Sequence, residues 1–152
     1  MPLKVLSYNI REGGRFRLRA LARVIRAQQP DVVALLEANS RVGAQLLARQ
    51  LGMRLIFGRA YNAFHVAWLS RLPVTQSANH RLPTLAKTLL EIEVRWQDAP
   101  LRLFATLMVR FDNDRQKLFS AMQPLASHWL STSTEPLIVT SPGLRPRPAT
   151  SV

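Results

Sequence analysis

The chain has 152 residues, of which 47% are hydrophobic, so it is long enough for one domain with a substantial core. It contains no cysteine, which excludes disulfides, thiolate nucleophiles and thiolate metal sites, and its apolar runs are too short to span a membrane. The formal net charge of +12 favours an anionic partner, although a GC-rich genome would also enrich arginine and scatter it over the surface.

The start of the sequence reads as a strand and does not have the pattern of a signal peptide, so we expect a cytoplasmic protein. Residues 3–8 alternate between apolar and polar types and predict a strand. The paired glycines in "IREGG" mark a loop, and residues 16–29 carry the apolar stripe of a helix that ends at Pro30. Residues 31–36, "DVVALL", predict a strand buried on both faces, so the segment is expected to be a βαβ unit with parallel strands.

Later segments predict a second helix and more strands. Ser40 can cap a helix that Gly52 ends. The expected elements are a helix over 40–51, strands over 54–58 and 64–73, an antiparallel hairpin over 88–96 and 101–109 turned by "QDAP", a helix over 114–130 and a strand over 136–140. Residues 1–140 are therefore expected to form one α/β domain, followed by a Pro-, Ser- and Arg-rich tail over 141–152 that we expect to be disordered.

Two of the predicted buried strands end on a polar residue, Asn9 in the first and Glu37 in the second. Ligands of open α/β sheets bind outside the carboxyl ends of the strands, so these two side chains are expected to lie near each other. One carboxylate beside an amide suits Mg²⁺, which keeps several waters and takes few protein ligands. The same residue types also cap turns and helices, and the spacing alone does not distinguish a metal site from such a cap.

The segments "LKVLSYNIREGG", "QQPDVVALLEA" and "HVAWLSRLPV", followed by the "LLEIEVRW…LRLFAT" hairpin, resemble the endonuclease/exonuclease/phosphatase superfamily. The resemblance runs from residue 3 to about residue 106 and implies a two-sheet α/β sandwich that is incomplete at its C-terminus. It also implies a metal-dependent phosphoesterase that uses Mg²⁺ or Mn²⁺, in which Asn9 positions the scissile phosphate and Glu37 binds the metal.

Other motifs of that superfamily are missing here. Leu107 stands where the resemblance calls for the His of a Thr-His-Leu motif, and "SPGL" replaces the Gly-Asp-Phe-Asn motif. The Ser-Asp-His motif is also absent, so we expect little or no turnover. A frameshift near the end of the gene, a gene fragment or a divergent pseudoenzyme would each give such a sequence, and the substrate stays open among DNA, RNA, lipids and small phosphate esters.

Two alternatives come from other classes. The arginines could make the chain a non-catalytic module that binds nucleic acid or another polyanion, or the chain could be a truncated product without function. The remaining polar candidates are expected to be structural: His65 on a strand, His80 in a loop, His128 on the last helix, Asp112 and Asp114 in a helix-capping turn, and Ser70. Oligomeric state is not readable from the sequence.

Overall fold

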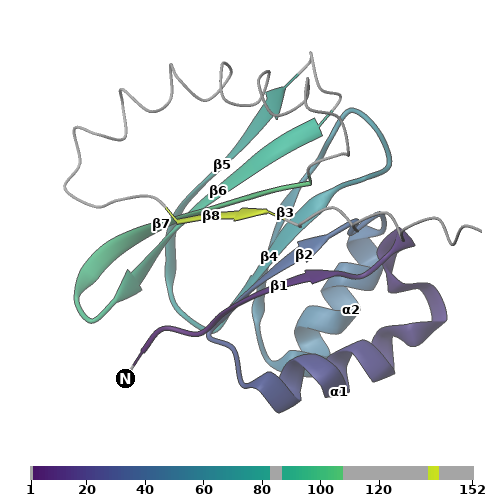
Figure 1. The fold of residues 1–152 in the computed structure, drawn as a ribbon, viewed down its shortest axis with the longest axis horizontal. Coiled ribbons are helices and arrows are strands. Elements are labelled where there is room, and N and C mark those ends of the chain that lie inside the picture. Colours follow the sequence, from purple (N-terminus) through teal and green to yellow (C-terminus); the bar gives the residue numbers. More distant parts are fainter. Residues whose placement is uncertain (1, 83–86, 108–136, 141–152) are drawn as a thin grey trace, which may run out of the picture.

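The computed structural model describes residues 2–82, 87–107 and 137–140, which form two four-stranded sheets and a layer of helices (Figure 1). The elements are β1 (Val5–Asn9), the 3₁₀ segment η1 (Glu12–Arg17), α1 (Leu18–Gln28), β2 (Val32–Leu36), α2 (Arg41–Leu51), β3 (Arg54–Gly58), β4 (Val66–Ser70), β5 (Val74–Leu82), β6 (Lys87–Trp96), β7 (Ala99–Thr106) and β8 (Leu137–Thr140). The predicted two-sheet α/β sandwich is confirmed. The expected helix over 114–130 and the tail over 141–152 lie outside the described residues.

The first sheet has the strand order β1-β2-β4-β3, and its first two strands are parallel. Helix α1 connects β1 to β2, so the βαβ unit read from the sequence is confirmed. The second sheet has the order β5-β6-β7-β8, in which β6 is antiparallel to both β5 and β7, and β8 is parallel to β7.

Strand β2 is apolar throughout because both of its faces are covered. Val33 and Leu35 pack with α1 and α2, whereas Val32, Ala34 and Leu36 pack towards the second sheet. All five residues are fully buried. Among the described residues the first sheet therefore lies between the helices and the second sheet, as a continuous apolar run predicts for a strand without a solvent-facing side.

Trp68 joins the two sheets. It lies on β4, is fully buried in the core between the sheets, and its Nε1 donates a hydrogen bond to the carbonyl oxygen of Leu90 on β6 at 3.0 Å. The indole thus fills the core with its largest side chain and also finds the polar partner that a buried Trp needs.

Helix α2 begins and ends where the sequence predicts. The Ser40 side chain accepts a hydrogen bond from the Gly43 N–H at 3.1 Å, and Gly52 closes the helix with a left-handed φ of 65°. The β6–β7 hairpin is also confirmed, and its two turn residues, Gln97 and Asp98, both have positive φ, as tight hairpin turns favour.

The sequence reading was wrong on β5. Residues 74–82, "VTQSANHRL", lack a run of apolar residues and were not expected to be a strand, yet they form the outer strand beside β6. His80 accordingly lies on a strand and not in a loop, with its Nε2 2.8 Å from Glu91 Oε2. His65, expected on a strand, lies just before β4.

Candidate functional site

Asn9 and Glu37 lie side by side at the carboxyl ends of β1 and β2. Asn9 is the last residue of β1, pairs in register with Leu36, and Glu37 follows directly. The Asn9 Nδ2 donates to Glu37 Oε1 at 2.8 Å, and both side chains are half-buried. The parallel pairing of the two strands therefore brings together two residues that are 28 positions apart in the sequence.

The loop after β1 folds over this pair. The Arg11 N–H donates to Asn9 Oδ1 at 2.9 Å, and the Gly13 N–H donates to the Glu37 carbonyl oxygen at 2.8 Å. Gly13 has a φ of 73°, and a Cβ there would lie 3.1 Å from the Ser40 backbone nitrogen. Glycine is needed here both for the left-handed backbone and for the close approach to the start of α2.

The backbone of Glu37 is itself left-handed, with a φ of 57°. A residue with a Cβ adopts this conformation at a cost of about 1–2 kcal/mol. Non-glycine residues held in such a conformation concentrate at functional sites. Six other non-glycine residues of the described chain also have positive φ, among them Gln97 and Asp98 in the β6–β7 turn, so the φ of Glu37 does not by itself mark a functional site.

The donor set around Glu37 fits a weakly held, hydrated cation. Oε1 is engaged by Asn9, whereas the Glu12 N–H approaches Oε2 only at 3.4 Å, which is long for a hydrogen bond and leaves this oxygen able to coordinate. Glu12 is exposed and forms an ion pair with Arg15 at 2.6 Å. Among the described residues no group of three or more His, Asp or Glu side chains could hold a metal, so water and a substrate phosphate would complete the shell, as Mg²⁺ allows.

Leu107 directly follows β7 and is 8% exposed, packed in the apolar core between the sheets with Leu36 and Ala105. The position from which the resemblance would supply an imidazole therefore holds an apolar core side chain. Ser70 is also structural, since its Oγ donates to the Leu72 carbonyl oxygen at 2.9 Å. His128, Asp112 and Asp114 lie outside the described residues.

A pocket that the sequence did not indicate begins two residues after Glu37. It has a volume of about 510 Å³ and is lined by Asn39, Arg41, Phe57, Arg59, Ala60, Tyr61, Asn62, His65 and Arg81. The Asn39 N–H donates to the Glu37 carbonyl oxygen, and the Ala38 N–H donates to the His65 carbonyl oxygen, each at 2.8 Å. These two bonds connect the pocket residues Asn39 and His65 to the backbone of Glu37 and Ala38.

His65 is held neutral in this pocket. Burial lowers its pKa from the usual 6.5, and the nearby Arg59 guanidinium lowers it further. Its Nδ1 accepts a hydrogen bond from the Ala60 N–H at 3.1 Å, which a protonated ring could not do, so the neutral ring carries its proton on Nε2.

The free energy of unfolding is expected to fall as the pH drops below about 6.5. The depressed pKa means that the unfolded chain binds a proton that the folded chain does not, so acid favours unfolding. Denaturant unfolding between pH 5.5 and 7.5 measures this slope, and His65→Gln is expected to reduce it. An unchanged slope in His65→Gln would contradict the prediction.

Within the described ranges, none of the helices has the length and hydropathy that a bilayer-spanning segment requires.

Comparison with known proteins gives one family. The model of the endonuclease/exonuclease/phosphatase family matches residues 6–150. No curated protein matches. Similar solved structures include zebrafish (D. rerio) TDP2 complexed with single-strand DNA product, with a TM-score of 0.74 and 19% identity over 95% of this chain and 62% of that one.

Two further structures show the same fold. A mannosyl-6-phosphatase of Bacteroides thetaiotaomicron has a TM-score of 0.76 and 14% identity, covering 91% of this chain and 64% of that chain. The human Nocturnin catalytic domain with bound sulfate has a TM-score of 0.68 and 18% identity, with coverages of 91% and 64%. The chain thus spans less than two thirds of the length of these structures.

Proposed function

Because the chain belongs to the endonuclease/exonuclease/phosphatase family, we propose that it is a metal-dependent phosphoesterase domain that is catalytically impaired as written. Glu37 would bind Mg²⁺ or Mn²⁺, and the Asn9 amide would orient the scissile phosphate. The observation that carries the proposal is the 2.8 Å contact between Asn9 Nδ2 and Glu37 Oε1 at the ends of two parallel strands. The neighbouring structures include a phosphatase and a protein bound to a DNA product, so a phosphate ester, including nucleic acid, is the expected substrate class.

Each residue has a distinct role in this proposal. The half-buried Glu37 carboxylate supplies the negative charge for the cation, and the hydrogen bond from Asn9 fixes the direction of that carboxylate. The Arg11 N–H in turn fixes the Asn9 amide through its Oδ1. A bound Mg²⁺ would stabilise the charge that develops on the phosphoryl oxygens.

We expect catalysis to be impaired because the chain lacks the residues that would move protons. Activating a water needs a base with a suitable pKa within hydrogen-bonding reach of it. Leu107 offers none, and "SPGL" lacks the Asp and Asn that the superfamily motif contains. Since such groups act as a unit, Asn9 and Glu37 are not expected to sustain turnover on their own.

The proposal is tested by two measurements on the unmodified chain. Mn²⁺ binding is followed by electron paramagnetic resonance, and hydrolysis of bis(p-nitrophenyl) phosphate and p-nitrophenyl phosphate is followed in Mg²⁺ or Mn²⁺. We expect weak Mn²⁺ binding and no hydrolysis above the metal-only rate. The absence of Mn²⁺ binding would refute the role of Glu37, and metal-dependent turnover would refute the impairment.

A second candidate function is a basic module that binds polyanions without catalysis. It is favoured by the net charge of +12 and by exposed arginines on the outer layer, such as Arg19 and Arg23 on α1. Binding of a mixed-sequence oligonucleotide that is lost between about 50 and 200 mM salt would support it. The third reading, a non-functional fragment, predicts aggregation, whereas a cooperative thermal melt of a soluble monomer would exclude it.

We also propose that residues 1–140 form the domain, that residues 141–152 are a disordered tail, and that the protein is cytoplasmic. Limited proteolysis is expected to remove residues 141–152 and leave residues 1–140 intact. The absence of cysteine from the sequence is compatible with a cytoplasmic location, where disulfides do not form.

A further inference from the structure

The arginines of the pocket come from three separate parts of the chain. Arg41 opens α2, Arg59 follows β3, and Arg81 lies on β5. Because they are 18 and 22 positions apart, they do not form a block in the sequence, and only the fold gathers them. No acidic residue is among those that line the pocket, so its cationic charge is not neutralised from within.

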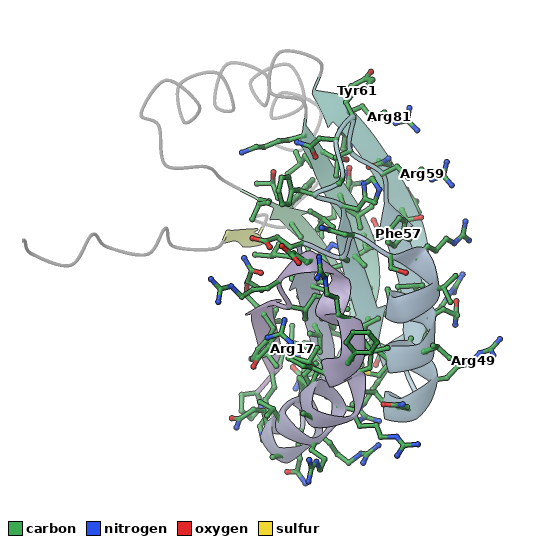
Figure 2. The ribbon with its side chains drawn as sticks, turned by 90° about the vertical axis from the view of Figure 1, so that its right-hand side faces the viewer. Arg17, Arg49, Phe57, Arg59, Tyr61 and Arg81 are labelled. Carbon is green, nitrogen blue, oxygen red and sulfur yellow. The ribbon has the colours of Figure 1, made fainter. Side chains whose placement is uncertain are left out.

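Two contacts within the pocket region involve its arginines. The Arg81 guanidinium carbon lies 5.7 Å from the centre of the Tyr61 ring, a cation–π contact that restricts the arginine. Asn79 Nδ2 donates to the Arg59 carbonyl oxygen at 3.1 Å and fixes the backbone there. Figure 2 shows Arg59, Tyr61 and Arg81 along one edge of the molecule, with Arg49 farther along α2.

Neutral and aromatic groups complete the wall. His65 carries its ring proton on Nε2 when neutral and packs edge-on against Phe57, with ring centres 5.4 Å apart. Guanidinium groups bind phosphate oxygens through two parallel N–H bonds, which an ammonium group cannot do. A volume of about 510 Å³ is within the range of sites that hold small ligands.

We propose that this pocket binds a second phosphate group of the substrate, next to the phosphate ester that Asn9 and Glu37 hold. This inference rests on the proposed function, because that proposal places the first phosphate at Asn9 and Glu37. Asn39, which lines the pocket, lies two residues after Glu37 and donates its backbone N–H to the Glu37 carbonyl oxygen at 2.8 Å, so the pocket begins beside the Glu37 backbone. The preferred ligand then carries at least two phosphate groups, as a short nucleic-acid strand or a bisphosphorylated sugar does.

The test compares two triple variants that remove the same charge. Arg41→Gln, Arg59→Gln and Arg81→Gln are combined in the pocket variant, and Arg19→Gln, Arg23→Gln and Arg49→Gln in the control variant. Binding of the dinucleotide pTpT is measured by calorimetry at 50 mM salt in EDTA, so that no metal contributes. Loss of even one charged hydrogen bond weakens binding about tenfold. We therefore expect the pocket variant to lose at least about tenfold in affinity and the control less than about threefold; equal losses in the two variants would overturn the proposal.

A second measurement covers the case in which the pocket variant does not fold. Titration of the unmodified, ¹⁵N-labelled chain with pTpT is expected to shift the amide signals of residues 59–65, and shifts confined to α1 would overturn the proposal. Fructose 1,6-bisphosphate shows which part of the ligand is recognised. If it binds as tightly as pTpT, the pocket recognises the phosphates alone; if it binds more weakly than pTpT, the pocket also recognises the nucleotide. Weaker binding of pTpT than of inorganic phosphate would also overturn the proposal.

The two proposals fail separately in these experiments. Binding of pTpT in EDTA reports on the pocket, because Glu37 holds no cation there, whereas Mn²⁺ binding reports on Glu37, which does not line the pocket. A chain that binds pTpT but no Mn²⁺ would refute the role of Glu37 and leave the pocket standing.

Discussion

Trp68→Ala is expected to lower the free energy of unfolding by about 3–5 kcal/mol, the cost of removing a large aromatic side chain from a packed core. The indole is fully buried between the sheets and donates to the Leu90 carbonyl oxygen on the opposite sheet. Domains of this size are stable by only about 5–15 kcal/mol, so the loss is a large part of the total. Urea unfolding followed by far-ultraviolet circular dichroism measures it.

Trp68→Phe separates packing from hydrogen bonding in the same position. Phenylalanine retains most of the apolar contact but cannot donate to Leu90, so we expect an intermediate loss that includes about 0.5–1.5 kcal/mol for the lost hydrogen bond. Trp96→Ala is the matched control for Trp68→Ala, because Trp96 is only half-buried at the end of β6. If Trp68→Ala cost no more than Trp96→Ala, the indole would not be the residue that joins the sheets.

Glu37→Gln is expected to weaken Mn²⁺ binding by at least about tenfold. Substitution of groups that only support a metal ligand already costs about 10–100-fold in affinity, and Glu37 is proposed as the ligand itself. Glutamine keeps the size and an oxygen that can accept from Asn9 but removes the charge that attracts the cation. Electron paramagnetic resonance of free Mn²⁺ measures the change.

Asp98→Asn is the matched control for this measurement. Asp98 is exposed in the β6–β7 turn and has a φ of 65°, a backbone that asparagine tolerates well. The variant removes the same charge without touching the Asn9–Glu37 pair, so its Mn²⁺ affinity should be unchanged. A loss of equal size in both variants would show that net charge, and not Glu37, governs cation binding.

The sequence predicted the interior of the fold better than its edges. Strand β2 was readable because burial on both faces requires an uninterrupted apolar run, and α2 because Ser40 and Gly52 perform the local chemistry of helix ends. Strand β5 was missed because an outer strand can be stabilised by backbone hydrogen bonds to β6 while its side chains stay polar.

One part of the site, the Asn9–Glu37 pair, was predictable from the sequence, whereas the pocket was not. The closeness of Asn9 and Glu37 follows from parallel strands joined by one crossover, a rule that needs only the order of the elements. The pocket was not predictable, because Arg41, Arg59 and Arg81 are brought together by a helix start, a loop and the strand that was missed. Such a site depends on tertiary positions and leaves no local pattern in the chain.

The left-handed backbone at Glu37 has an evolutionary consequence. Glycine and asparagine tolerate this φ better than glutamate does, so mutational drift that preserved only folding would tend to replace the acidic residue. A lineage in which the carboxylate still serves a purpose would keep it against that bias. The residues found at this position in descendants of the gene would therefore record whether the carboxylate remains in use.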